Sequence, residues 1–122
     1  MVADDDAGTR RLLADLLESF GHEVLLAKDG YGAWQMAFQE TPQLIVMDIL
    51  MPEHYGSTVY KMLQNDSRTA DIPIIFISAL PTEQVRPLLP DDAKTRFIPK
   101  PLDLDRFQET VEELLSGGRR GV

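Results

Sequence analysis

The sequence predicts an α/β fold in which helices cover both faces of a parallel sheet. Short apolar runs alternate five times with segments whose apolar residues recur at helical spacing. Two of these runs, residues 44–47 and 74–77, are apolar at every position, as expected for strands that are buried on both faces. There is no internal repeat and no linker between domains. Alternation of this kind implies parallel strands joined by right-handed crossovers.

The first strand is predicted at residues 1–3, which is shorter than the usual five or so residues. Either this strand is genuinely short or further residues precede it. A helix follows, and Asp6 is well placed to cap its first turn. The predicted apolar face of this helix ends before Gly21 and comprises Leu12, Leu13, Leu16, Leu17 and Phe20.

A second strand is predicted at residues 24–27, with Asp29-Gly30 as the turn that ends it. The second helix ends before Pro42, and its apolar face comprises Ala33, Trp34, Ala37 and Phe38. At this spacing we interpret Trp34 as a core residue and not as part of a binding site.

The third strand leads from the run at 44–47 into Asp48, between Pro42 and Pro52. A helix is then predicted from Gly56 to the break at residues 65–67, with an apolar face formed by Val59, Met62 and Leu63. Strand four is predicted at residues 74–78, and a brief strand five at Phe97-Ile98. The last helix is predicted to start near Asp103 and to end at Gly117-Gly118, with Leu104, Phe107, Val111, Leu114 and Leu115 on one face.

The segment between strands four and five contains three prolines, Pro81, Pro87 and Pro90. A proline inside a helix costs on the order of 3 kcal/mol, and it restricts the residue before it. We therefore expect the helix from Thr82 to be short or distorted, and residues 89–91 to be extended. Few internal hydrogen bonds would make this the least protected part of the domain.

Length and composition indicate one globular domain over residues 1–122, with residues 116–122 as a flexible tail or linker stub. The formal net charge of −8 disfavours binding to nucleic acid. No apolar run approaches the roughly 20 residues of a membrane span, and acidic residues from position 4 argue against a secretory leader. The absence of cysteine excludes disulfides and fits a reducing cytoplasm.

Conspicuous polar residues follow four of the predicted strands. Asp4 and Asp5 follow the first strand, and the third, fourth and fifth strands end at Asp48, Ser78 and Lys100. Parallel strands bring their carboxyl ends to one edge of the sheet, where ligands bind in such folds. Each residue alone has an ordinary interpretation, and Asp48 could simply cap the following turn. Their joint occurrence favours a site.

The residue types indicate the chemistry of this site. Three carboxylates brought together repel one another unless a cation joins them, and Mg²⁺ commonly binds one or two carboxylates together with water and phosphate. Lys100 adds a positive charge suited to a phosphoryl oxygen, and Ser78 adds a hydroxyl. The set predicts a carboxylate that accepts a phosphoryl group.

The sequence resembles the receiver domains of bacterial two-component response regulators over essentially its whole length. The resemblance rests on Asp4-Asp5, on Asp48 followed by Met51-Pro52 and Gly56, on Ser78-Ala79 and on Lys100-Pro101. It implies a flavodoxin-like, three-layer αβα fold with a five-stranded sheet in the order 2-1-3-4-5, two helices on one face and three on the other. It also implies a cytoplasmic regulatory domain and not an enzyme.

The resemblance assigns a role to each site residue. Asp48 would accept a phosphoryl group from a histidine kinase or a phosphotransfer protein. Asp5, Asp48 and the Leu50 backbone carbonyl would bind Mg²⁺ (or Mn²⁺), and Asp4 would act largely through a water. Lys100 would pair with the phosphoryl group. Ser78 and Phe97 would move on phosphorylation and so signal to an output domain, a downstream protein or a second copy in a homodimer.

The sequence departs from the family at several positions. Tyr55 stands where an aspartate usually precedes the loop glycine, and Ala93-Lys94 replaces a common Gly-Ala pair. Together with the prolines, these changes affect the face made by helix four, strand five and helix five, where the family usually binds partners.

Three other readings compete with a receiver. A flavodoxin-like electron carrier is disfavoured because three aspartates at residues 4–6 would repel a flavin phosphate. A dehalogenase-type phosphatase is disfavoured because Leu50 stands where a second acid is needed. A phosphorylation-independent interaction module of the same fold is the third alternative.

Overall fold

The computed structural model describes residues 1–51, 55–90 and 92–116. Its strands are β1 (Val2–Ala3), β2 (Leu26–Ala27), β3 (Ile45–Asp48), β4 (Ile74–Ser78) and β5 (Thr95–Pro99). Its helices are α1 (Ala7–Ser19), α2 (Gly30–Glu40), α3 (Gly56–Gln64), α4 (Thr82–Val85), the 3₁₀-helix η1 (Arg86–Leu88) and α5 (Leu104–Ser116). Pro52, Glu53, His54, Asp91 and the predicted tail after Ser116 lie outside the described residues.

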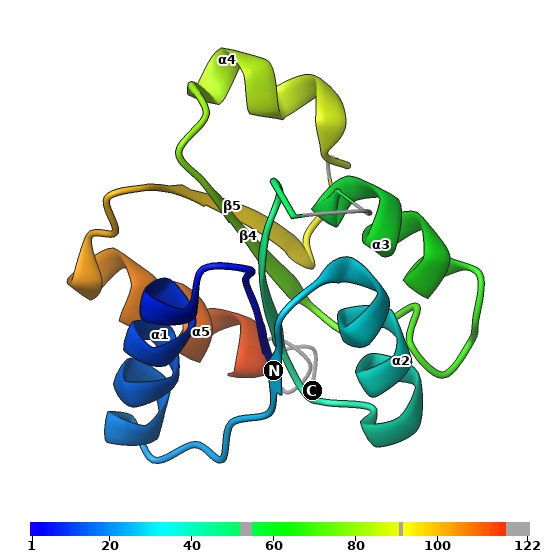
Figure 1. Cartoon of the computed structure of the whole chain (residues 1–122), viewed down its shortest axis with the longest axis horizontal. Coiled ribbons are helices and arrows are strands. Elements are labelled where there is room, and N and C mark those ends of the chain that lie inside the picture. The colour runs from blue at the N-terminus through cyan, green and yellow to red at the C-terminus, as the bar shows by residue number, and fades with distance from the viewer. Residues whose placement is uncertain (52–54, 91, 117–122) are drawn as a thin grey trace.

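The strands form one parallel sheet in the order β2-β1-β3-β4-β5, which confirms the predicted topology (Figure 1). The short β1 lies in the middle of the sheet, where Val2 is level with Leu26 of β2 and Val46 of β3. The long apolar runs form the central pair, in which Asp48 is level with Ile77. All carboxyl ends therefore lie at one edge of the sheet.

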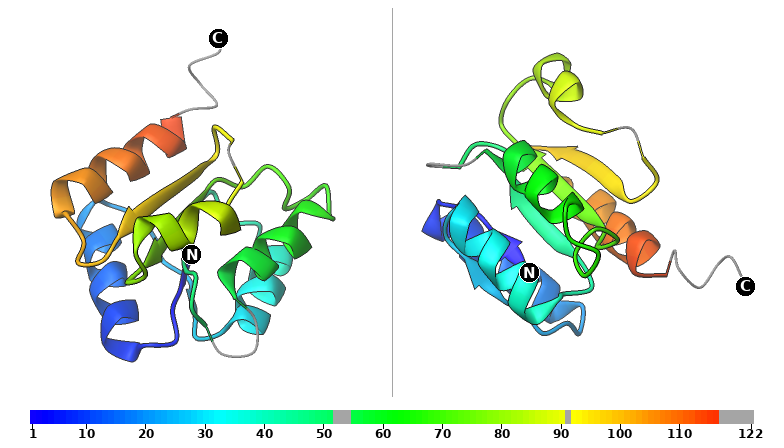
Figure 2. Two further views of the ribbon diagram at one scale, coloured as in Figure 1. Left: turned by 90° about the horizontal axis from the view of Figure 1, so that it is seen from above. Right: turned by 90° about the vertical axis from the view of Figure 1, so that its right-hand side faces the viewer.

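The helices cover the two faces of the sheet, so the fold has three layers (Figure 2). One apolar core joins the sheet to α1 and α5 through Leu13, Leu17, Phe107 and Val111. The other core joins it to α2, α3 and α4 through Ala33, Ala37, Val59, Leu63 and Val85, with Trp34 packed against it. The predicted division of two helices and three helices is thus confirmed.

Aspartates precede three of these helices, and at α5 the Oδ1 of Asp103 accepts from the Arg106 amide at 3.1 Å. Asp6 caps α1, because its Oδ2 accepts a hydrogen bond of 2.8 Å from the Thr9 amide. Asp29 caps α2 in the same way, with Oδ1 2.7 Å from the Gly32 amide nitrogen. The prediction for Asp6 is confirmed, whereas Asp29-Gly30 is the start of a helix and not only a turn that ends a strand.

Several predicted boundaries and faces need correction. β2 spans two residues instead of four, and β5 spans five instead of two. β5 has one fully buried residue, Ile98, because it is an edge strand; its apolar signal is correspondingly weak. The helical spacing predicts Leu12 and Leu104 on buried helix faces, but these residues are 53% and 52% exposed.

The helix in the proline-rich segment is as short as predicted. α4 has four residues, Pro87 falls within the single turn of η1, and Leu89 is extended with φ −113° and ψ 148°. None of the described helices is long and apolar enough to cross a membrane.

Candidate functional site

Hydrogen bonds of both its backbone and its side chain fix Asp4, the residue that follows β1. The Asp4 amide donates to the Ala27 carbonyl oxygen at 3.1 Å, which extends the pairing of β1 with β2. The Asp4 side chain is fully buried, and its Oδ1 accepts from the Asp6 amide at 2.9 Å. A buried carboxylate needs such partners, because an unpaired charge in the interior is costly.

Asp48 is the last residue of β3 and is 6% exposed. Its Oδ1 accepts from the Leu50 amide at 3.0 Å, and its Oδ2 lies 2.8 Å from the Lys100 ammonium. The first bond is the turn-capping interaction that the sequence suggested as an alternative. Both interpretations hold, because the same carboxylate caps the turn and faces a cation.

Lys100 joins the two buried carboxylates. Its Nζ lies 2.8 Å from Asp48 Oδ2 and 3.4 Å from Asp4 Oδ2, and its backbone amide donates to the Ser78 carbonyl oxygen at 2.9 Å. That backbone bond places the residue after β5 directly beside the end of β4. The lysine therefore reaches the acidic residues from the opposite half of the sheet.

The three carboxylates that the sequence singled out come together. Oxygens of Asp4, Asp5 and Asp48 all lie within 4.8 Å of one another, with Asp5 exposed and the other two buried. Oxygen ligands of this number and charge suit a hard divalent cation such as Mg²⁺. The residues present therefore fit the metal that the sequence predicts.

Burial and charge both perturb this cluster. Desolvation raises the pKa of Asp4 and the neighbouring Asp48 charge adds to it, while the Asp6 amide and Lys100 act in the opposite direction. For Lys100, desolvation acts to lower the pKa, but the hydrogen bond and charge of Asp48 outweigh it and raise the pKa. Lys100 is thus held as a cation between two carboxylates.

Sequence comparison gives the family of the chain. Residues 1–112 match the family described as Response regulator receiver domain. The chain belongs to that family. It is 31% identical to the polar-differentiation response regulator DivK of Brucella anthropi over 94% of each chain. It is 34% identical to RpaA of Synechocystis, a DNA-binding transcriptional regulator, over 94% of this chain and 48% of that protein.

Solved structures of receiver domains have the same fold. The receiver domain of the Francisella response regulator 1452 superposes with a TM-score of 0.82, at 28% identity and over 96% of this chain and 95% of that one. The receiver domain of the sensor histidine kinase PA1611 from Pseudomonas aeruginosa superposes with a TM-score of 0.86 at 21% identity, over 94% of each chain. At that identity the second likeness supports the fold alone.

The remaining residues predicted for the site of the receiver are Ser78, Leu50 and Phe97. Ser78 ends β4 and is fully buried, and its Oγ accepts from the Leu80 amide at 3.0 Å. Leu50 contributes its amide to Asp48, while its side chain is 43% exposed. Phe97 lies in the middle of β5, level with Phe76, and packs against the core on the α2–α4 side.

Sequence reasoning missed Arg10. This α1 residue extends its side chain back to β1, and its Nη1 donates to the Asp4 backbone carbonyl oxygen at 2.8 Å. The available signal was its position one helical turn after the cap, since the Arg10 amide bonds to the Asp6 carbonyl. From there an arginine reaches the end of the strand.

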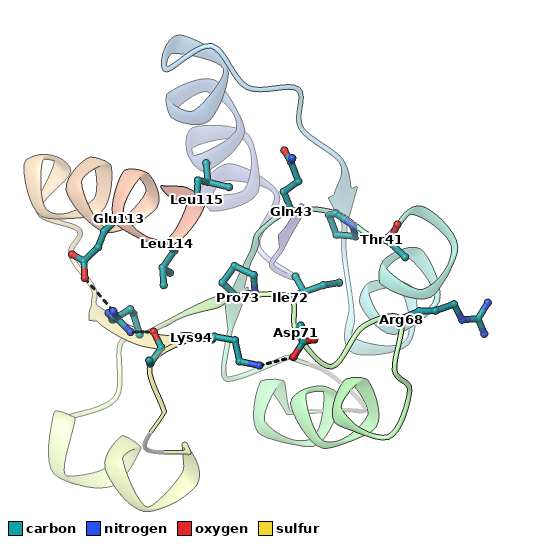
Figure 3. A pocket seen from close by; sticks show the side chains of 13 residues that line it. Thr41, Gln43, Arg68, Asp71, Ile72, Pro73, Lys94, Glu113, Leu114 and Leu115 are labelled. Atoms are coloured by element: carbon teal, nitrogen blue, oxygen red, sulfur yellow. Dashed lines mark hydrogen bonds and ion pairs between the residues drawn. The ribbon is translucent and has the colours of Figure 1, made fainter. Parts of the chain in front are cut away.

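A cavity of about 800 Å³ lies at the opposite, amino-terminal edge of the sheet and contains none of the acidic cluster (Figure 3). Segments that precede β3, β4 and β5 line it together with the end of α5. Four of its charged side chains pair with one another, Lys94 with Asp71 at 3.0 Å and Arg96 with Glu113 at 3.1 Å, whereas Arg68 pairs with Asp66 outside the lining. The acidic cluster therefore lies away from this cavity, at the carboxyl edge of the sheet.

Proposed function

We propose that this receiver is a phosphorylation-dependent switch in which Asp48 accepts a phosphoryl group from a sensor histidine kinase or a phosphotransfer protein. One observation carries the proposal. Asp48 stands at the end of a central strand with one oxygen held by the Leu50 amide and the other by Lys100, next to two further carboxylates. This arrangement suits a carboxylate nucleophile beside a cation for the incoming phosphoryl oxygens.

The proposed transfer involves only the phosphohistidine of the donor and the carboxylate of Asp48. A carboxylate oxygen forms a bond to phosphorus while the bond between phosphorus and the histidine nitrogen breaks, and the imidazole leaves with that electron pair. The bonds from Leu50 and Lys100 fix the orientation of the carboxylate before the donor arrives. The fixed orientation reduces the entropic part of the barrier.

The acidic cluster provides the metal site of this proposal. Asp5 and Asp48 would bind Mg²⁺ (or Mn²⁺) together with the Leu50 backbone carbonyl, and Asp4 would act largely through a water. When bound, the ion neutralises charge on the phosphoryl oxygens. Support comes from the spacing of the three carboxylates. The PA1611 receiver, which shares the fold, has a magnesium ion in its active site cleft.

The switch would carry the change from Asp48 to a partner surface. In this proposal Ser78 contacts the phosphoryl group, and Phe97 responds by changing its packing two strands away from β3. Ser78 ends the strand that lies between β3 and β5, and Phe97 is half-buried beside Phe76. This arrangement supports a route along β4 and β5.

The partner surface would be the face formed by α4, β5 and α5. A cavity of about 610 Å³ lies on this face. Among the described residues, its lining consists of apolar residues, two threonines and three arginines and contains no acidic residue: Thr82, Val85, Arg86, Leu89, Pro90, Thr95, Arg96, Phe97, Pro99 and Arg106. On a chain with a net charge of −8, such a groove favours an output domain, a downstream protein or a second copy that presents carboxylates.

Kinase contact would occur at the carboxyl edge. Leu50, two residues after Asp48, and Leu104, four residues after Lys100, both expose large apolar side chains. These side chains would add buried apolar area to a protein contact at this edge. A cytoplasmic location is part of the proposal, because the chain has no cysteine and its phosphodonors would act there.

The test is labelling by a small phosphodonor. With acetyl phosphate and MgCl₂, the receiver should gain one phosphoryl group by intact mass, and Asp48→Asn should gain none because its nearly isosteric amide is not a nucleophile. Asp71→Asn is the control, since this residue pairs with Lys94 at the opposite edge. Full labelling of Asp48→Asn would refute the assignment. A wild-type protein that takes no label would favour the interaction module.

A further inference from the structure

We infer that Arg10 is a positioning residue that sets the exposed Asp5 carboxylate for the divalent cation. The inference rests on the proposed function, because it concerns the metal site of the same receiver. It starts from the hydrogen bond of 2.8 Å between Arg10 Nη1 and the backbone carbonyl oxygen of Asp4.

Asp5 differs from its two partners in how it is held. Asp4 and Asp48 are buried, and both bond to backbone amides and to Lys100. Asp5 is exposed, and within the described part of the chain its side chain has no hydrogen bond or ion pair that would fix it. Its direction therefore depends on the backbone that carries it.

The Arg10 bond acts on that backbone. The Asp4 carbonyl and the Asp5 amide belong to one planar peptide unit, so a group that fixes the carbonyl also fixes the start of Asp5. Arg10 is the one side chain among the described residues that donates to this oxygen. Removing the donor would let the peptide plane rotate, and the Asp5 carboxylate would move away from Asp4 and Asp48.

Charge alone predicts the opposite result. Arg10 is a cation close to a site for a cation, so its loss should tighten Mg²⁺ binding if electrostatics dominated. If positioning dominates, its loss should weaken binding, as for other groups that orient metal ligands without touching the metal, whose loss costs about 10-fold to 100-fold in affinity. The sign of the change separates the two effects.

The experiment is Mg²⁺ titration by calorimetry on the apo protein. Arg10→Met keeps the aliphatic stem but removes donor and charge, and we expect Kd to rise about tenfold. Arg11→Met is the matched control on the same helix. Arg11 pairs with Asp15 and Glu18, and its substitution removes the same charge. Arg11→Met should leave Kd within about twofold of the wild-type value.

Arg10→Lys provides a second measurement that keeps the charge and a single donor. We expect its Kd to lie between those of the wild type and Arg10→Met. If Arg10→Met does not fold, Arg10→Lys against Arg11→Lys decides the question. Weaker binding by Arg10→Lys alone supports the inference, and equal affinities overturn it. Unchanged or tighter binding by a folded Arg10→Met also overturns it.

These outcomes separate the inference from the proposed function. Wild-type protein that binds no Mg²⁺ contradicts the metal site itself. Wild-type protein that binds Mg²⁺ and is labelled on Asp48, with Arg10→Met equal to Arg11→Met, contradicts only the role of Arg10. Thermal melting without metal provides a further check, because a purely structural role would lower Tm and leave Kd unchanged in the folded variant.

Discussion

The carboxyl edge of the sheet and the α4–η1 segment differ in how they are held. At the edge, Asp4, Asp48 and Lys100 come from three strands and bond across as many as 96 residues of sequence. In the segment the backbone hydrogen bonds are local, as between Val85 and Pro81, and the residues lie at the periphery (Figure 1). Val85 is its one fully buried side chain.

This difference shows which part of a receiver tolerates change. The acidic cluster and Lys100 depend on one another, so a substitution at one leaves a buried charge without its partner. The segment from Thr82 to Leu88 contains a proline that would break a longer helix, and the fold accommodates it with a 3₁₀ turn. The proposed chemistry is thus tightly constrained, and the proposed partner surface is free to diverge.

Hydrogen exchange should show the largest contrast between the two regions. Amides of β3 and β4 should exchange about a thousandfold more slowly than those of residues 83–89, a difference of about 4 kcal/mol in opening free energy. The central strands bond on both sides, whereas α4 has a single turn. Exchange resolved by residue would measure this. Equal protection in both regions would remove the basis of the comparison.

Gly56→Ala should be the most damaging single substitution beside the carboxyl edge. A Cβ at this position would lie 2.7 Å from the Asp48 carbonyl oxygen and 3.1 Å from the Ile49 Cα, both of which are backbone atoms. We expect a loss of about 3 kcal/mol in urea unfolding. Gly8→Ala is the control, because its Cβ would meet nothing nearer than 3.5 Å and alanine favours the helix. A loss below 1 kcal/mol for Gly56→Ala would contradict the rigidity of this edge.

A pair of buried valines compares the α4–η1 segment with α3, the helix that follows β3. Val59 in α3 and Val85 in α4 are both fully buried on the same side of the sheet. Val59→Ala should cost about 2 kcal/mol, and Val85→Ala about 1 kcal/mol, because a four-residue helix can relax into the cavity. Chemical denaturation of both variants measures the difference. Equal costs would mean that α4 is held as firmly as α3.

Tyr55→Asp should have a small effect, comparable in size to that of Val85→Ala, and it should be stabilising. Tyr55 occupies the N-cap position of α3 with extended backbone angles and makes no capping hydrogen bond with its side chain. An aspartate there should add about 1 kcal/mol to the unfolding free energy by accepting from a free helix amide. Tyr55→Ala separates capping from the loss of an exposed ring. If alanine stabilises as much as aspartate, capping is not the cause.

The sequence was sufficient for the topology and for most of the cluster. Runs such as 44–47 and 74–77 indicate central strands, because burial on both faces leaves no polar position and their short length and flanking prolines argue against a helix. Once those strands are parallel, their terminal residues must share an edge, which is why Asp4, Asp48 and Lys100 converge. The prolines likewise determined the short α4 through local geometry alone.

Other features had no such signal. β5 pairs with β4 alone and has one fully buried residue, so no apolar run in the sequence indicates its length. Leu12 and Leu104 fit the helical period but lie at the margins of their helix faces, where periodicity does not distinguish buried from exposed. Arg10 bonds to a backbone carbonyl, which is the same at every residue type, so its only signal was its position one helical turn after the Asp6 cap.

The ion pair between Lys100 and Asp4 has a consequence for biosynthesis. A ribosome delivers the chain from its amino terminus, so Asp4 and Asp48 emerge well before the cation that joins them. Until β5 has been added beside β4, the two carboxylates lack their shared lysine and the edge is incomplete. Under the proposed function, a chain that has not yet added β5 would lack the cation that faces Asp48, so phosphotransfer would await the finished domain.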